Sequence, residues 1–172
     1  MSAAIRTVAE LMELSARTAP KAAGKDFIEI VTLYGDDLKR VGEDMLKMAE
    51  ERNVPGFARD GKNVLASEAL VLIGVREHAG MGLDCASCGF KSCGEMKQGT
   101  VATDYAGPSC SMRLLDMGIA LGSAVKTAGI HNVDNRIMYR AGVSAKRLGF
   151  IKASVVMGIP LSVTGKSIYY DR

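Results

Sequence analysis

The chain has 172 residues, of which 48% are hydrophobic and 24% charged, and its formal net charge is +3. This composition is ordinary for a globular protein and predicts a single domain over residues 1–172. Basic residues are spread along the chain and are not interleaved with aromatic ones, so we do not expect nucleic-acid binding. No apolar run reaches the roughly 20 residues of a membrane span, and Arg6, Glu10 and Glu13 interrupt the N-terminal stretch. We therefore expect a cytoplasmic protein without membrane contact.

Helices and strands alternate in the first half of the predicted structure. The expected elements are a helix over 4–17, a strand over 27–33, a helix from about 36 to 53, a short helix over 62–67 and a strand over 69–75. Apolar residues recur every three or four positions in the helices, and Pro20 ends the first one. Asp36 or Asp37 is the predicted N-cap of the second helix. Residues 69–75 are continuously apolar, which is typical of a buried strand.

A glycine-rich segment over residues 77–110 separates the two halves and is too irregular for a helix or strand. The expected elements after it are an apolar helix over 111–127, a helix capped by Asp134 that runs to about 148, a strand over 153–159 and a tail over 160–172. Helices mixed with a few strands predict an α+β fold, or a three-layer α/β arrangement, with residues 77–110 as an inserted segment.

All four cysteines of the chain lie within this segment, in the pattern Cys85-x2-Cys88-x4-Cys93-x16-Cys110. Thiolates are soft ligands that bind iron–sulfur clusters and zinc. The pattern is compatible with a [4Fe–4S] cluster held by the four cysteines. A structural zinc site is an alternative, although such sites usually consist of two Cys-x2-Cys pairs. Disulfides are less compatible with a cytoplasmic location.

The two histidines have no motif around them that indicates catalysis. We expect His78 to be a surface residue close to the cysteines, and His131 to lie at the end of the helix over 111–127. No other side chain is predicted to act as a catalytic acid or base, and the catalytic residues stay unknown.

The cysteine spacing, with Gly89 directly after Cys88, resembles the four-iron module of ion-pumping ferredoxin oxidoreductases and corrinoid iron–sulfur proteins. This resemblance implies that Cys85, Cys88, Cys93 and Cys110 are cluster ligands. It implies electron transfer but no particular substrate.

A second, looser resemblance concerns the rest of the chain. The stretch Ser15-Ala-Arg-Thr-Ala-Pro-Lys-Ala-Ala-Gly24 is similar to the Ala-Pro-Ser segment of nitroreductase-like flavoproteins, and Met157-Gly-Ile-Pro160 is similar to their closing strand. The resemblance implies a homodimer that binds flavin mononucleotide (FMN) between its subunits, with the glycine-containing helix over 114–125 in the interface. The implied flavin contacts are Arg17, Thr18, Lys21, Lys166 and Arg172. The chain departs from that family in having Lys21 after Pro20, where serine is usual.

Over nearly its full length the chain resembles bacterial and archaeal proteins described as containing a ferredoxin domain. The stretches that carry this resemblance are Arg17-Thr-Ala-Pro-Lys21, Cys85–Cys93, Asp116–Ser123, Asp134–Tyr139, and Gly158–Leu161 through Gly165-Lys166 to Asp171-Arg172.

The first hypothesis is an iron–sulfur flavoprotein oxidoreductase with FMN and one [4Fe–4S] cluster per chain, whose partner is a small redox carrier or a small-molecule substrate. A ferredoxin-like electron carrier or redox sensor without flavin is the alternative. A zinc-stabilised interaction domain is the third hypothesis.

Overall fold

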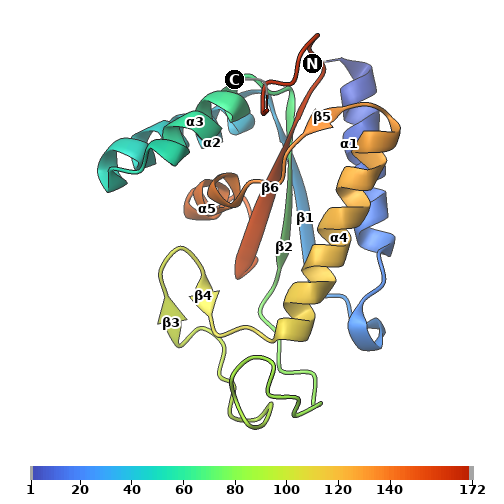
Figure 1. Ribbon diagram of the computed structural model, residues 1–172, viewed down its shortest axis with the longest axis vertical. Coiled ribbons are helices and arrows are strands. Elements are labelled where there is room, and N and C mark those ends of the chain that lie inside the picture. Colours follow the sequence, from blue (N-terminus) through green and yellow to red (C-terminus); the bar gives the residue numbers. More distant parts are fainter. Residues whose placement is uncertain (1, 171–172) are drawn as a thin grey trace.

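A four-stranded antiparallel sheet forms the middle layer of the computed structural model, which describes residues 2–170 (Figure 1). Its strands, in spatial order, are β1 (Ile28–Tyr34), β2 (Ala69–Val75), β6 (Val155–Ser162) and β5 (Asp134–Asn135). Every residue of β2 is buried, as its continuous apolar sequence predicts. The register places Ile28, Val75 and Val155 at one end of the sheet, and Tyr34, Ala69 and Leu161 at the other.

Helices α1 (Ala3–Thr18) and α4 (Ser111–Ile130) cover one face of the sheet (Figure 1). Ser2 caps α1 through its hydroxyl, which accepts a hydrogen bond from Ile5 N–H. Apolar residues of both helices, among them Met12 and Ala124, pack against side chains of the sheet such as Ile73. This half of the core runs along the whole length of α4.

Helices α2 (Gly35–Arg52), α3 (Pro55–Leu65) and α5 (Tyr139–Arg147) cover the other face of the sheet (Figure 1). A second apolar core contains Met45, Leu72 and Val156. Helix α5 lies so close to β6 that a Cβ atom at Gly142 would be 2.1 Å from the carbonyl oxygen of Val156. The two cores on opposite faces make a three-layer α/β/α arrangement, and the α+β class predicted from the sequence is confirmed.

The remaining short elements are η1 (Ala22–Gly24), which follows α1, and the hairpin formed by β3 (Val101–Ala102) and β4 (Ala106–Gly107). Both lie at the end of the sheet where β2 finishes and β6 starts (Figure 1). Within residues 2–170, no helix is both long and apolar enough to cross a membrane.

Three local predictions differ from the structure. Pro55 begins α3 at its first turn, where a missing N–H costs nothing, so the helix covers 55–65 and not 62–67. Asp134 does not cap a helix. It lies in β5, where it pairs with Ser162 of β6, and α5 begins only at Tyr139. Asp36 and Asp37 lie in the first turn of α2 without capping it, since Tyr34 is the N-cap residue.

The last strand also continues past Pro160 to Ser162, beyond the predicted end at residue 159. Gly158 exchanges backbone hydrogen bonds with Met138. Backbone groups two residues apart in a strand point to the same side, so an N–H at position 160 would also point toward this neighbouring segment. The ladder to β5 resumes only at Leu161, opposite Asn135. Pro160 therefore lies at an interruption of the ladder, where its missing N–H breaks no hydrogen bond.

Candidate metal centre

The cysteine segment leaves the sheet at the end of β2 and returns to the body of the molecule at the start of α4 (Figure 1). It contains no helix, and its only strands are the two short ones of the β3–β4 hairpin. Its first and last parts are held by two buried residues, His78 and Cys110. The segment thus forms a loop that covers one end of the sandwich.

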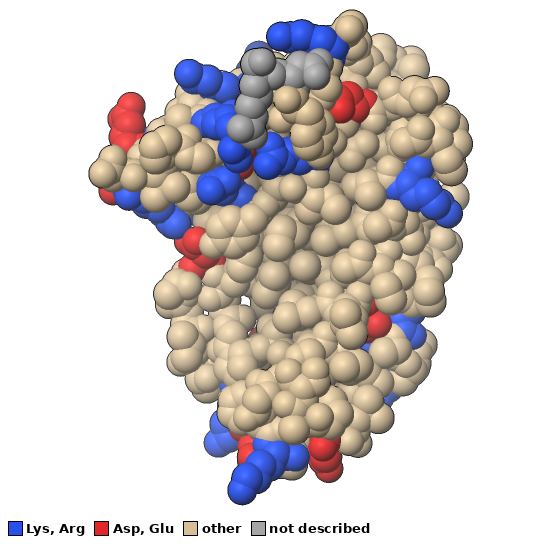
Figure 2. Space-filling model, viewed as in Figure 1, with Lys and Arg blue, Asp and Glu red and all other residues tan. Residues whose placement is uncertain are grey.

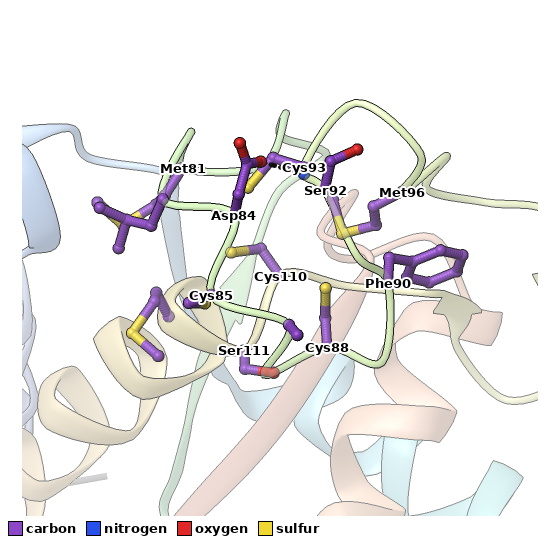
Figure 3. Close-up of a pocket in the computed structure, with 14 residues that line it drawn as sticks. Met81, Asp84, Cys85, Cys88, Phe90, Ser92, Cys93, Met96, Cys110 and Ser111 are labelled. Carbon is purple, nitrogen blue, oxygen red and sulfur yellow. Dashed lines mark hydrogen bonds between the residues drawn. The ribbon is translucent and has the colours of Figure 1, made fainter.

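All four cysteines line one pocket inside this loop, together with apolar side chains such as Met81, Leu83 and Met96. Figure 3 shows the sulfur atoms of Cys88, Cys93 and Cys110 on the inner side of the loop. Cys110 is buried, Cys88 and Cys93 are partly buried, and Cys85 is exposed; all four are free thiols. The structure therefore brings together the four residues that the sequence predicts as ligands.

The spacing of these thiols bears on what they can hold. Within the described part of the chain, no three His, Cys, Asp or Glu side chains come close enough to hold a single metal ion. Four thiols around one pocket match the number of ligands that a [4Fe–4S] core takes, and a structural zinc ion can also take four. The residues present fit a cluster by donor type, by number and by their shared pocket.

The backbone on both sides of Cys85 has an unusual conformation. Asp84 and Ala86 adopt left-handed φ angles of 47° and 55°, which residues with a Cβ atom rarely do. The Asp84 carboxylate accepts a hydrogen bond of 2.7 Å from Cys93 N–H and thereby joins the two arms of the loop. Such strain persists only where the surroundings impose it, and it is frequent at functional sites.

Cys93 is held closely by glycines. Its Sγ accepts a hydrogen bond of 3.3 Å from Gly82 N–H, and a Cβ atom at Gly80 would lie 2.8 Å from the Cβ of Cys93. Hydrogen bonds from backbone N–H groups to cysteine sulfur are among the features that set the potential of iron–sulfur clusters. Gly80 is therefore required for a close approach and not for a turn.

Cys110 is the N-cap residue of α4, and its position depends on His78. The backbone N–H of Cys110 donates a hydrogen bond of 3.2 Å to His78 Nε2, and His78 Nδ1 donates one of 2.8 Å to the carbonyl of Arg76. The prediction that His78 is a surface residue is wrong, because it is buried with only 6% of its surface exposed. His131 does lie at the end of α4, as predicted, and is its C-cap residue.

The position of Cys110 also has an electrostatic consequence. The N-terminal end of a helix carries a partial positive charge, and α4 extends over 20 residues from this point. A thiolate at a helix N-terminus is stabilised relative to the thiol. The most buried of the four cysteines therefore lies at the positive end of a long helix.

An ion pair that the sequence analysis missed lies one turn into α4. Arg113 and Asp116 are both buried and are joined at 2.9 Å. Arg113 also donates to the carbonyl of Ala22, and Asp116 accepts from the N–H of Ala22, so the pair holds η1 against the helix. The guanidinium lies 4.8 Å from the centre of the Phe27 ring, which in turn contacts the His78 ring. Two oppositely charged residues at i and i+3 in the first turns of a largely apolar helix are the signal that could have revealed this pair.

Three of the predicted flavin contacts lie close together at the C-terminal end of α1, where each has an intramolecular partner. Arg17 forms an ion pair with Asp26 at 2.7 Å, Thr18 donates to the carbonyl of Leu14, and Lys21 donates to the carbonyls of Ala16 and Arg17. Burial lowers the pKa of Lys21, with the charge of Asp26 opposing the change. Partial burial raises the pKa of Asp26, but hydrogen bonds from Arg17 and Ile28 N–H outweigh it and leave the pKa below its usual value.

Lys166 lies at the opposite end of the sheet. It follows β6, whose last residue Ser162 is at the far end of the strand from Val155, and nearby Tyr169 contacts Ser67 next to the start of β2. Arg172 lies outside the described residues. Within one chain, the described members of the predicted flavin set therefore do not converge on one site.

Comparison with solved structures identifies the fold class. The FMN-dependent nitroreductase NfnB from Mycobacterium smegmatis, solved in complex with NADPH, has a TM-score of 0.62 at 10% sequence identity, covering 95% of this chain and 81% of that one. A nitroreductase-like family protein from Bacillus cereus has a TM-score of 0.60 at 11% identity, covering 94% of this chain and 76% of that one. The chain has a nitroreductase-like fold, as expected from its sequence.

Sequence comparison gives the family. A family model described as "Uncharacterized protein containing a ferredoxin domain (DUF2148)" matches residues 106–172, which include Cys110. A protein of Archaeoglobus fulgidus, described as an uncharacterized protein, is 46% identical over 169 residues, which are 98% of this chain and 91% of that protein. The chain belongs to the same family as this archaeal protein, and the match of residues 106–172 to the family described as containing a ferredoxin domain confirms the family expected from its sequence.

Proposed function

We propose that the protein is an iron–sulfur redox protein that holds one [4Fe–4S] cluster through Cys85, Cys88, Cys93 and Cys110. The observation that carries this proposal is that four free thiols, and no more, line a single pocket at the start of α4. When bound, such a cluster accepts and releases one electron at a time. The nitroreductase-like fold and the ferredoxin-domain family both support a redox function.

The residues around the thiols have separate tasks in this proposal. Met81, Leu83, Met96 and Phe90 line the pocket and reduce the access of water to it. Gly82 N–H and the N-terminus of α4 stabilise negative charge on sulfur. His78 fixes the backbone of the most buried ligand. Iron–sulfur potentials depend on hydrogen bonds to sulfur and on solvent exposure, so these groups would set the potential.

An ultraviolet–visible spectrum of protein purified without oxygen, combined with iron and acid-labile sulfide analysis, tests this proposal. We expect a broad brown absorption and about four iron atoms per chain. Zinc without iron would favour the zinc-stabilised interaction domain. Absence of both metals from protein that is otherwise folded would contradict the metal centre itself.

The proposal includes FMN as a second cofactor, held between two chains. The fold supports this part, since two of the structurally similar proteins are described as an FMN-dependent nitroreductase and as an oxidoreductase containing FMN. When bound, FMN exchanges electrons in pairs with a small-molecule substrate or singly with a carrier. Without FMN, the chain would act as a ferredoxin-like electron carrier or redox sensor.

A homodimer would reconcile the flavin prediction with the positions of its residues. The outer face of α4 exposes apolar side chains and glycines with open space around them, including Leu115, Gly118, Ile119 and Gly122. Figure 2 shows that the side of the molecule that carries α4 is largely uncharged. If two copies pack antiparallel through α4, opposite ends of the two sheets come together. Lys166 of one chain would then lie at the same end of the dimer as Arg17 and Lys21 of the other.

Two measurements test this second part. Ile119→Asp should convert a dimer to a monomer in sedimentation equilibrium, whereas Leu65→Asp on the partly exposed surface of α3 should not. Resolved flavin bands in the spectrum of the dimer, lost in the Ile119→Asp variant, would support an FMN site between chains. A wild-type protein that is monomeric and still binds FMN would contradict it.

A further inference from the structure

A groove lies beside the cysteine pocket, between the β3–β4 hairpin and the adjoining starts of α4 and β6. Its volume is about 530 Å³, within the usual range of roughly 300–1,000 Å³ for small-molecule sites. The apolar side chains that form most of its walls are Phe90, Val101, Tyr105, Pro108, Leu114 and Val155. Figure 2 shows that the surface is hollowed beside the hairpin and that most of the side chains around it are uncharged.

The groove is apolar but has two aliphatic hydroxyl groups in its wall, besides the phenol of Tyr105. Among the described residues, no charged side chain lines it, and Thr100 and Ser109 provide the aliphatic hydroxyls. Thr100 donates its proton to the carbonyl of Lys97. Ser109 Oγ accepts a hydrogen bond of 3.4 Å from Gln98, so its own proton can still be donated to a ligand. A dianionic phosphate has no counter-charge here, whereas an uncharged ring with a carbonyl oxygen does find a donor.

Phe90 connects the groove to the metal centre, because it lines both pockets. Figure 3 shows its ring directed away from the cysteine sulfurs. Ser109 directly precedes Cys110 in the chain, and Leu114 lies one helical turn after it. A molecule in the groove would thus be separated from the thiols by little more than one side chain, which is well placed for a redox-active ligand.

The outer wall of the groove is fixed to the body of the protein. Asp104, between the two strands of the hairpin, forms an ion pair of 2.6 Å with Arg52 and accepts a hydrogen bond from Tyr139. The Tyr105 hydroxyl donates to the carbonyl of Val156. Burial raises the pKa of Tyr105 well above its usual range, so this hydroxyl remains neutral. The groove is therefore preformed, and a ligand need not order the hairpin in order to bind.

We propose that this groove binds an uncharged quinone, with the flat ring between Phe90 and Leu114 and one carbonyl oxygen accepting a hydrogen bond from Ser109. This inference rests on the proposed function, because the neighbouring cluster is what makes a redox-active ring the preferred occupant. It adds a ligand class and a position to that function. None of the flavin contacts implied by the nitroreductase resemblance lines this groove, so we treat it as a separate site.

The test is equilibrium dialysis of anaerobically purified protein against 2-methyl-1,4-naphthoquinone, with iron measured in the same sample. Ala106 lines the groove, so Ala106→Leu should fill it and weaken binding at least tenfold. Thr103→Leu, in the same hairpin but lining a different depression, should leave binding within about twofold, as expected for substitutions outside a site. Ser109→Ala should weaken binding by about two- to tenfold, the value of one hydrogen bond.

Three results would overturn the inference: no quinone binding by iron-containing protein, equal binding by wild type and Ala106→Leu, or displacement of the quinone by FMN. The last result would assign the groove to the flavin ring. The protein as purified could also lack iron and still bind quinone, with Ala106→Leu abolishing that binding. This result would support the groove as a ring-binding site and contradict the proposed cluster. The iron value thus separates failure of the site from failure of the proposed function.

Discussion

The α/β/α sandwich and the cysteine segment achieve order in different ways. Every residue of β2 is buried, whereas between residues 79 and 109 only Met96 is. Burial of apolar surface, at roughly 25 cal/mol per Å², is enough to define the sandwich. The segment relies on a few hydrogen bonds around four thiols, and a long loop with so little core is expected to need a ligand to organise it. This difference predicts that the proposed cluster site and the scaffold can be disturbed separately.

The largest expected effect is loss of the proposed cluster in Cys110→Ser, because this proposed ligand is both buried and held at the start of α4. Iron should fall from about four atoms per chain to nearly none, since a serine hydroxyl is a poor ligand for iron–sulfur clusters. Ser92→Ala, which changes a pocket residue without sulfur, is the control and should retain its iron. Retention of a full cluster by Cys110→Ser would contradict the ligand assignment.

The next effect belongs to the sandwich. Leu72 is fully buried in the core between the sheet and α2, α3 and α5. Leu72→Ala should lower the free energy of unfolding by about 2–5 kcal/mol, measured by denaturant titration. Leu14→Ala, at a site that is 58% exposed, should change it by less than about 0.5 kcal/mol. If the sandwich and the cysteine segment are independent, the folded fraction of Leu72→Ala should bind as much iron as the wild type.

An intermediate effect is expected at the junction of the two regions. His78→Ala leaves the N–H of Cys110 without its acceptor, at a cost of about 1–3 kcal/mol. We expect iron to be bound but to be lost to a chelator several times faster than from wild type. His131→Ala, in an exposed position at the other end of α4, should show no such change. Equal rates in all three proteins would mean that His78 does not position the ligand.

The smallest effect concerns the hairpin and pH. The pKa of Asp104 is lowered because hydrogen bonds from Tyr139 and Arg52 outweigh the effect of partial burial, and the pKa of Tyr139 is raised to about 12 by burial and by Asp104. A lowered carboxyl pKa means stability that is present above the unfolded value of about 3.9 and lost as pH falls through the folded value. In Tyr139→Phe the pKa of Asp104 should rise, so that this loss begins at higher pH.

Carboxyl-carbon NMR of Asp104 measures that pKa directly. The associated loss of stability should be about 1 kcal/mol, as for a single hydrogen bond. Tyr170→Phe removes a hydroxyl from an exposed ring and serves as the control. An unchanged Asp104 pKa in Tyr139→Phe would show that the hydrogen bond does not hold the hairpin.

Many features of both regions were predictable from the sequence. Continuous apolarity gave β2, helical spacing gave α1, α2 and α4, and the four cysteines predicted a shared site that the structure does form. Long periodic elements are predictable because their pattern repeats over many residues.

The errors concern residues whose local signal has two meanings. Pro55 can end one helix or begin the next, and Asp134 can cap a helix or pair in an edge strand. The burial of His78 depends on contacts with Phe27 and Cys110, which are 51 and 32 residues away in the chain, so no local pattern reveals it. The positions of Lys166 and Arg17 at opposite ends of the sheet likewise follow only from strand register.

Hydrogen–deuterium exchange of the iron-loaded protein, compared with the same protein after anaerobic chelation, tests the central claim most directly. The account predicts that amides over residues 79–100 lose their protection when iron is removed, while those of β2 and α4 keep theirs. Equal protection of residues 79–100 with and without iron would show that the segment is ordered by its own contacts, and would contradict the claim that a bound cluster organises it.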